Sequence, residues 1–380
     1  MDLHFTEEQD KFRQEVIDFC KAERGDPSSF SRKLSEKGWP GLSIPKEYGG
    51  LGLGAIYRVI FMEEIAYWRA PVAPYDYGVT TSLLGNICLK YGSEEQKKEY
   101  LPKIARGKIF CGQGYSEPQA GNDLTMVQTR AVHQGDYYVI NGQKMWVHDA
   151  RTYKYTLLMA CTNPDVAPEE GLSMFIVDNE LPGVTVRPQL AMSGQLTPEV
   201  FLDDVKVPAT NLLGEENRGW DYYLENKPFY WNKEQGAETG MIRRIFNDIV
   251  RYARETIKDG YPLNQNPMVR QKLAKMAIDI NALRFLMYRM AWMETQGLDL
   301  FHIASIARVF HVEAWVRFIN TATQILGLGG QLQLREKHAP LRGIMETFYR
   351  QAALQLMQRA GPSYIKSIIA THELGLPEAW

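Results

Sequence analysis

The sequence predicts a mainly α-helical protein with a β-domain in its middle. Near the N-terminus, apolar residues recur at the spacing of amphipathic helices. Between residues 109 and 207 the pattern changes to the alternation that is typical of strands. After residue 214 helical periodicity returns and continues to the end of the chain. We therefore expect three domains, with boundaries at residues 1–108, 109–214 and 215–380.

The first domain is expected to contain four helices separated by loops. Thr6 followed by Gln9 has the spacing of a capping box, and Phe12, Val16 and Cys20 follow at helical spacing. Residues 38–54 are rich in glycine and proline, which predicts a loop. The helices are expected at residues 6–22, 55–68, 78–91 and 93–106.

The middle domain is expected to be built from short strands. The turn Gln134-Gly135-Asp136 separates two runs rich in β-branched and aromatic residues, and this arrangement predicts a β-hairpin. The strands are expected at residues 127–132, 137–147, 155–162, 172–177, 184–188 and 200–207. Six helices should follow, at residues 220–231, 237–258, 267–297, 300–326, 344–359 and 363–374.

The composition indicates an ordinary globular protein. The 380 residues are 45% hydrophobic and 23% charged, and the formal net charge is −2, which gives no basis for binding nucleic acid or a charged membrane surface. The four cysteines show no metal-ligand spacing. The sequence contains neither an apolar leader near its start nor a run long enough to span a membrane. We expect a soluble cytoplasmic enzyme with no metal site.

The segment from Gly112 to His148 organises the rest of the chain. It contains YSEPQAGND, in which Pro118 and Gly121 predict a loop, and then the hairpin. The hairpin ends at Trp146, a bulky ring beside a polar loop, which could form a wall for a planar ligand.

This segment resembles the middle domain of the acyl-CoA dehydrogenase family. YSEPQAGND and YYVINGQKMWV are similar to the family's loop and hairpin that enclose the flavin ring of FAD. The segments GWPGLSIPKEYGGLG and YGSEEQKKEYLP also resemble family segments, in the same order along the chain. The resemblance implies an N-terminal α-bundle, a β-barrel-like middle domain and a C-terminal four-helix bundle.

The resemblance also implies which residues bind the cofactor. Gln113, Tyr115 and Ser116 would line the flavin, and Asn122 stands where the family often has a serine near the pyrophosphate. Alternatively, Ser116 merely caps a turn. The residues that would pack along the flavin are Trp146, Val147 and His148. His148 replaces the family's usual threonine and could instead point to solvent.

Family members are usually dimer-based and share their FAD sites between subunits. Gln324 and Gly327 resemble the segment that touches the partner's FAD, although Leu328 replaces its second glycine. The family's RxxFG segment is absent, and residues 259–267 stand in its place. We therefore expect a dimer or tetramer, either of identical chains or a hetero-oligomer.

The family's catalytic base is a glutamate, and both of its usual positions differ here. Aligning the glycines of the first motif places Ala360 at the base, and Lys227 lies about where the second glutamate belongs. Asp76 is the preferred substitute, because some relatives use an aspartate from this region. Asp76 could also be a plain N-cap, and Glu225 and Glu234 are further candidates.

Aromatic residues cluster at positions that should wall the acyl end of the pocket. The expected substrate-binding residues are Tyr75, Asn122, Tyr222 and Glu225, although such aromatic stripes are often ordinary core. The resemblance implies FAD-dependent α,β-dehydrogenation of an acyl-CoA whose acyl group is bulky or cyclic, with electrons passed to an electron-transfer flavoprotein. The alternatives are a lyase-type relative and a non-catalytic partner subunit.

Overall fold

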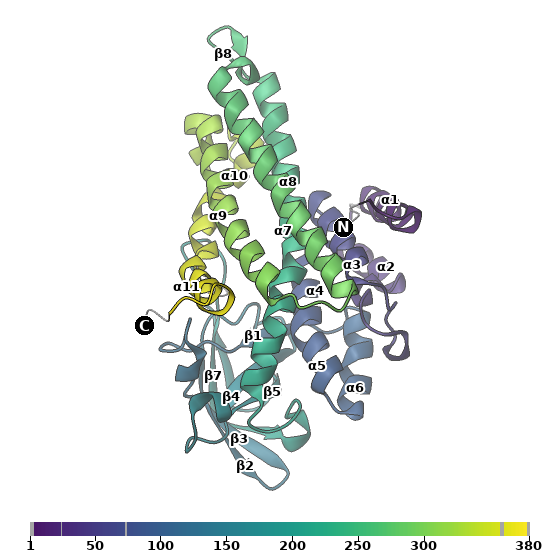
Figure 1. The fold of residues 1–380 in the computed structure, drawn as a ribbon, viewed down its shortest axis with the longest axis vertical. Helices are drawn as coiled ribbons and strands as arrows, with labels where there is room; N and C mark the ends of the chain where they lie inside the picture. The colour runs from purple at the N-terminus through teal and green to yellow at the C-terminus, as the bar shows by residue number, and fades with distance from the viewer. Residues whose placement is uncertain (1–3, 24, 73, 358–360, 378–380) are drawn as a thin grey trace.

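The computed structural model describes residues 4–23, 25–72, 74–357 and 361–377. Figure 1 shows the N-terminal helices on one side, long helices along the major axis, and the β-domain below them beside α11. The predicted fold class is confirmed, since helical regions flank a curled central sheet. None of the described helices is both long enough and apolar enough to cross a membrane.

The N-terminal region begins with the predicted capping box. The Gln9 amide donates to Thr6 Oγ1 at 3.2 Å, and the Thr6 amide donates to the Gln9 side chain at 3.0 Å. One helix, α2, was not predicted, although Asp26 as N-cap followed by Pro27 is a recognisable start signal. The helices are α1 (Glu7–Ala22), α2 (Pro27–Glu36), α3 (Ala55–Tyr67), α4 (Pro74–Thr80), α5 (Asn86–Tyr91) and α6 (Glu94–Ala105).

The middle region is one strongly curved sheet with its own core. The strands are β1 (Cys111–Gly114), β2 (Arg130–Gln134), β3 (Tyr137–Lys144), β4 (Tyr155–Cys161), β5 (Leu172–Asp178), β6 (Val184–Arg187) and β7 (Glu199–Pro208). They pair in the order β1-β4-β2-β3-β7-β6, and β5 also pairs with β4. The predicted hairpin is β2–β3, with Gln134 opposite Tyr137. Ile140, Phe175 and Val205 are among the side chains fully buried within this domain.

The C-terminal region is dominated by long helices. They are α7 (Gly219–Glu255), α8 (Pro267–Thr295), α9 (Phe301–Leu326), α10 (Ile344–Gln355) and α11 (Pro362–Ile368). The sequence predicted a break between residues 231 and 237, but α7 is one helix of 37 residues that continues through Pro228.

Two glycines of α7 lie where this helix packs closely against α3. A β-carbon on Gly240 would lie 2.0 Å from the Glu63 carbonyl oxygen, and one on Gly236 would lie 3.3 Å from Met62 Cβ. Gly236 and Gly240 therefore allow α3 and α7 to pack closely, and α7 continues through both of them.

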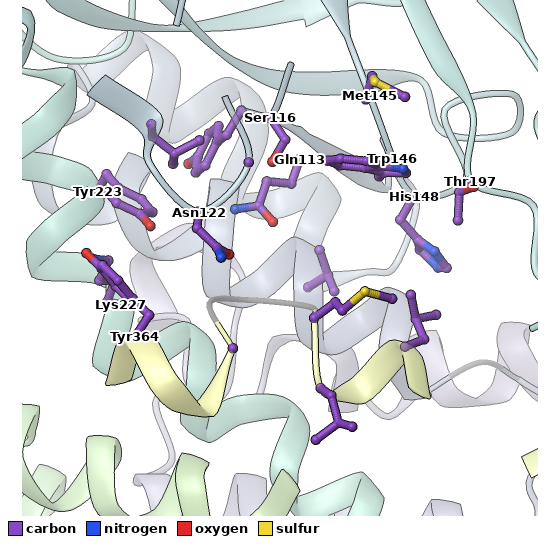
Figure 2. Close-up of a pocket in the computed structure, with 18 of the residues that line it drawn as sticks. Gln113, Ser116, Asn122, Met145, Trp146, His148, Thr197, Tyr223, Lys227 and Tyr364 are labelled. Atoms are coloured by element: carbon purple, nitrogen blue, oxygen red, sulfur yellow. The ribbon is translucent and has the colours of Figure 1, made fainter. Parts of the chain in front are cut away.

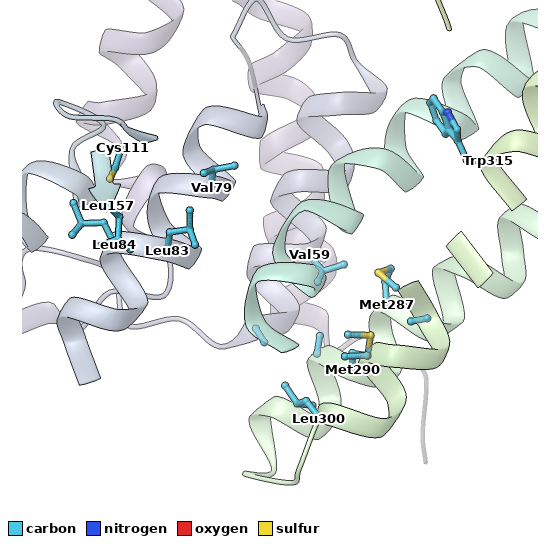
Figure 3. Packing of buried hydrophobic residues seen from close by; sticks show 14 of the residues in the cluster. Val59, Val79, Leu83, Leu84, Cys111, Leu157, Met287, Met290, Leu300 and Trp315 are labelled. Atoms are coloured by element: carbon cyan, nitrogen blue, oxygen red, sulfur yellow. The ribbon is translucent and has the colours of Figure 1, made fainter. Parts of the chain in front are cut away.

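A continuous core joins the β-domain to the helices. Figure 3 shows Leu83, Cys111 and Leu157 on one side of this cluster and Val59 and Met287 on the other. Because β1 and β4 are anchored in the same core as α7 and α8, the loop that follows β1 has a fixed position relative to the helices. That position defines the cavity described next.

Candidate active site

A cavity of about 680 Å³ lies where the β-domain faces α7 and the segment around α11. Figure 2 shows Lys227, Tyr223 and Tyr364 at one end, and Trp146, His148 and Thr197 at the other. Six residues of the predicted cofactor site line it together: Gln113, Tyr115, Ser116, Asn122, Trp146 and His148.

A buried ion pair fixes the loop that forms one wall. Lys144 Nζ lies 2.6 Å from Glu117 Oε1 and also donates to the Tyr115 carbonyl at 3.1 Å. Glu117 accepts the amides of Gln128 at 2.7 Å and Thr129 at 2.9 Å. The loop after β1 and the end of β3 are therefore locked together.

The electrostatics of this pair favour its charged form. Burial by itself would raise the pKa of Glu117, but the charge and hydrogen bonds of Lys144, Thr129 and Gln128 hold it below its ordinary value. Burial lowers the pKa of Lys144 to about 8, although Glu117 opposes that change. Both groups are therefore predominantly charged at neutral pH.

Trp146 is held in an unusual backbone conformation beside this loop. Its φ is +55°, a left-handed value that a bulky residue rarely adopts. The Met145 amide donates to the Ser116 carbonyl and the Val147 amide to the Pro198 carbonyl, so the chain is fixed on both sides of the ring. The indole is 49% exposed and faces the cavity, whereas the Val147 side chain is fully buried in the β-domain core.

Lys227 is the buried cation of the cavity. It lies on α7, is 5% exposed, and its Nζ is 4.6 Å from the centroid of the Tyr223 ring and 5.7 Å from that of Tyr364. Burial lowers the pKa of Lys227 to about 8. Among the side chains that the structure describes, no carboxylate lies within ion-pairing distance of this amine.

Asp76 lies behind His148 and does not line the cavity. Its carboxylate accepts the hydrogen bond of the Tyr153 hydroxyl and lies 3.9 Å from His148 Nε2. His148 Nε2 is also 2.8 Å from Asp149 Oδ2. A carboxylate in this position can orient His148, which does reach the cavity.

Two predicted substrate-binding residues lie outside the cavity lining. Tyr222 is buried, stacks on Tyr91 at 3.9 Å between ring centroids, and accepts the Glu215 amide at 3.0 Å. Glu225 is half-exposed and pairs with Lys90 and the Tyr91 hydroxyl. Both side chains are therefore engaged in contacts within the protein and do not line the cavity.

The remaining predicted residues lie at the end of α9 or outside the described side chains. Gln324 accepts a hydrogen bond from Lys272 at 2.8 Å, and Gly327 follows the helix with a φ of +61°. Neither lines this chain's cavity, and their contact with a partner's cofactor stays a prediction. The side chains of Tyr75 and Glu234, and the whole of Ala360, lie outside the part of the structure that is described.

Several other residues line the cavity, and no motif in the sequence predicted that they would do so. Gln195, Leu196 and Thr197 come from the connection between β6 and β7, and Leu354 and Met357 from the end of α10. Only the packing of the β-domain against the helices brings them to the cavity.

Comparison with known proteins gives the class to which this fold and cavity belong. Sequence models of the N-terminal, middle and C-terminal domains of acyl-CoA dehydrogenase match residues 6–108, 112–205 and 217–365. The chain therefore belongs to the acyl-CoA dehydrogenase family of flavin-dependent oxidoreductases, and its relatives support acyl-CoA dehydrogenation as its activity.

Individual relatives match over almost their whole length. The chain is 32% identical to the acyl-CoA dehydrogenase FadE26 of Mycobacterium tuberculosis, covering 97% of this chain and 93% of that one. The solved ChsE4-ChsE5 complex from Mycobacterium tuberculosis matches with a TM-score of 0.89 and 30% identity, and the Tcur3481-Tcur3483 steroid ACAD with 0.89 and 28%. Both structures cover 100% of this chain and are themselves covered to 100%.

Proposed function

We propose that the protein uses FAD to introduce an α,β double bond into a CoA thioester with a bulky or cyclic acyl group. The observation that carries this proposal is the 680 Å³ cavity between the loop after β1, Trp146 and the end bounded by α7 and α11. The cavity extends from an end at Trp146 and His148 to an end bounded by the rings of Tyr223 and Tyr364 (Figure 2). One ligand of this cavity would be the cofactor and the other the acyl chain.

The residues of the β-domain wall fit a flavin. The Trp146 indole offers a flat face, and Ser116 and Gln113 offer hydrogen-bonding groups close by (Figure 2). A β-carbon at Gly121 would lie 3.8 Å from Trp146 Cζ3, so the loop approaches the indole closely at this point. When bound there, the flavin supplies the capacity to accept a hydride.

The protein's own side chains would bind and orient the substrate at the other end of the cavity. Tyr223 and Tyr364 provide aromatic rings there (Figure 2), and Val79, Leu83 and Leu124 add apolar surface to the cavity lining. Excluding water around the thioester strengthens the interactions that stabilise a developing enolate. These features suit a ring-bearing acyl group better than a short straight chain.

The named relatives support this substrate class. One solved neighbour is a steroid ACAD, and a curated relative from Clostridium sporogenes, 30% identical, is a 3-(aryl)acrylate reductase. Both names describe substrates that carry rings. By analogy with a neighbour named as an electron transferring flavoprotein, we propose such a protein as the electron acceptor.

We further propose an oligomer in which Gln324 and Gly327 reach the partner's cofactor. Leu328, directly beyond them, is 85% exposed, so this end of α9 is accessible to a partner chain. The ChsE4-ChsE5 neighbour is a complex of two different chains, so a hetero-oligomer is included in this proposal.

An anaerobic visible spectrum of the purified protein, before and after addition of CoA thioesters, tests the function. We expect a flavin band that is bleached by a ring-bearing acyl-CoA and less by butyryl-CoA. A flavin band that no thioester changes would argue against dehydrogenation. A protein without flavin would indicate a partner subunit that completes another chain's site.

A further inference from the structure

The end of the cavity formed by α7 and α11 contains the side-chain amine of a lysine (Figure 2). Lys227 projects from α7 into the cavity beside Tyr364 (Figure 2) and is 5% exposed. The titratable groups that line the cavity with it are the phenols of Tyr115, Tyr223 and Tyr364 and the imidazole of His148. No lining residue that the structure describes is an aspartate or a glutamate.

We propose that Lys227, in its uncharged form, accepts the α-proton of the CoA thioester. This inference rests on the proposed function and adds the identity of the group that takes the proton. Asp76 is less well placed for that role, because it does not line the cavity. Its carboxylate lies on the far side of His148 from the cavity and accepts a hydrogen bond from the Tyr153 hydroxyl. In this arrangement Asp76 is a positioning residue.

The atoms and electrons of the proposed dehydrogenation balance with the thioester, Lys227 and the flavin alone. The α-carbon–hydrogen bond breaks, the proton passes to the Lys227 amine, and the amine becomes an ammonium. The electron pair of that bond becomes the new double bond, and the β-hydrogen leaves with its two electrons as hydride to the flavin, which is the oxidant of the proposed function. The faces of Tyr223 and Tyr364 then stabilise the new cation.

The surroundings of Lys227 favour an amine that can lose its proton near neutral pH. Its own helix presents Tyr223 and Asn226, and α11 presents Tyr364, whose pKa is raised mainly by burial and further by Asp123. Burial lowers the pKa of Lys227 itself to about 8. A base whose pKa lies near the working pH is the most effective proton acceptor.

The test compares wild-type protein with Lys227→Met and Lys227→Arg at equal flavin content. The first readout is the rate of flavin bleaching between pH 6 and pH 10. The second is exchange of the α-hydrogens of phenylacetyl-CoA in D₂O, because this thioester has no β-hydrogen that can leave as hydride. Lys227→Arg is the matched control, since arginine keeps the charge and cannot deprotonate.

We expect wild-type bleaching and exchange to rise about tenfold per pH unit and to level off near pH 8, and both variants to lose about 100-fold or more of each rate. Bleaching by Lys227→Met or Lys227→Arg within tenfold of wild type would overturn the inference and leave the proposed function intact. Exchange without bleaching in the wild type would support the inference and overturn dehydrogenation. If the wild type shows neither, the proposed function fails and the inference fails with it.

Discussion

Replacing Lys227 by methionine should stabilise the protein at neutral pH. Methionine has a similar length and carries no charge, so it fills the same buried position. A lysine pKa lowered from 10.5 to about 8 corresponds to about 3 kcal/mol against the folded state, at ~1.4 kcal/mol per pH unit. The cation–π contacts with Tyr223 and Tyr364 offset this cost by about 0.5–1 kcal/mol each. The free energy of unfolding of Lys227→Met should therefore exceed that of the wild type by about 1–2 kcal/mol.

Because the pKa of Lys227 is lower in the folded chain than in the unfolded chain, its effect on stability depends on pH. Between pH 8 and pH 10.5 the unfolded chain binds more protons at this lysine than the folded chain, so wild-type stability rises with pH in that window. The gain from Lys227→Met should therefore be full below pH 8 and should disappear by about pH 10.5. Urea denaturation at pH 7 and pH 10, with matched flavin content, measures both values.

Lys144→Met is the matched control because it removes a second buried lysine with the opposite expectation. The pKa of Lys144 is also lowered to about 8, but its amine is paired with Glu117 at 2.6 Å. Removing it leaves a buried carboxylate without its partner, and we expect a loss of about 3–5 kcal/mol. A loss of stability in Lys227→Met at pH 7, comparable to that of Lys144→Met, would refute the reasoning and indicate that the Lys227 amine has a counter-charge.

Three further changes test the placement of the site. Trp146→Ala should weaken flavin retention, because the indole forms the flat wall of the cavity; the flavin-to-protein ratio after gel filtration measures this, and an unchanged ratio would contradict the placement. Asp76→Asn should slow bleaching by less than about tenfold if the carboxylate only orients His148, and complete loss of bleaching with flavin still bound would return the proton-acceptor role to Asp76. Glu225→Gln removes a half-exposed ion pair with Lys90; it should cost less than about 1 kcal/mol and leave the bleaching rate unchanged, whereas a lost rate would place Glu225 in the acyl site.

The local pattern of residues was enough to predict the order of the elements. The change from helical to alternating periodicity at residue 109, and back after residue 214, depends on which side chains each element buries, and this is written directly in the sequence. The capping box at Thr6 is likewise a short-range interaction. The break predicted between residues 231 and 237 was wrong, because α7 is continuous there and packs through Gly236 against α3, a long-range contact that no local pattern reveals.

The YSEPQAGND loop and the hairpin that ends at Trp146 were recognisable in the sequence because each is a continuous motif with its own turn chemistry. The sequence by itself therefore determined the family, the central β-domain and the wall of the cavity that contains Ser116 and Trp146. The opposite wall was decided only by tertiary structure, since α7 and α11 are separated by more than a hundred residues and meet through a shared core. Burial between these elements is also what removes Lys227 from water and lowers its pKa, a property that depends on the surroundings of a residue and not on its neighbours in the chain.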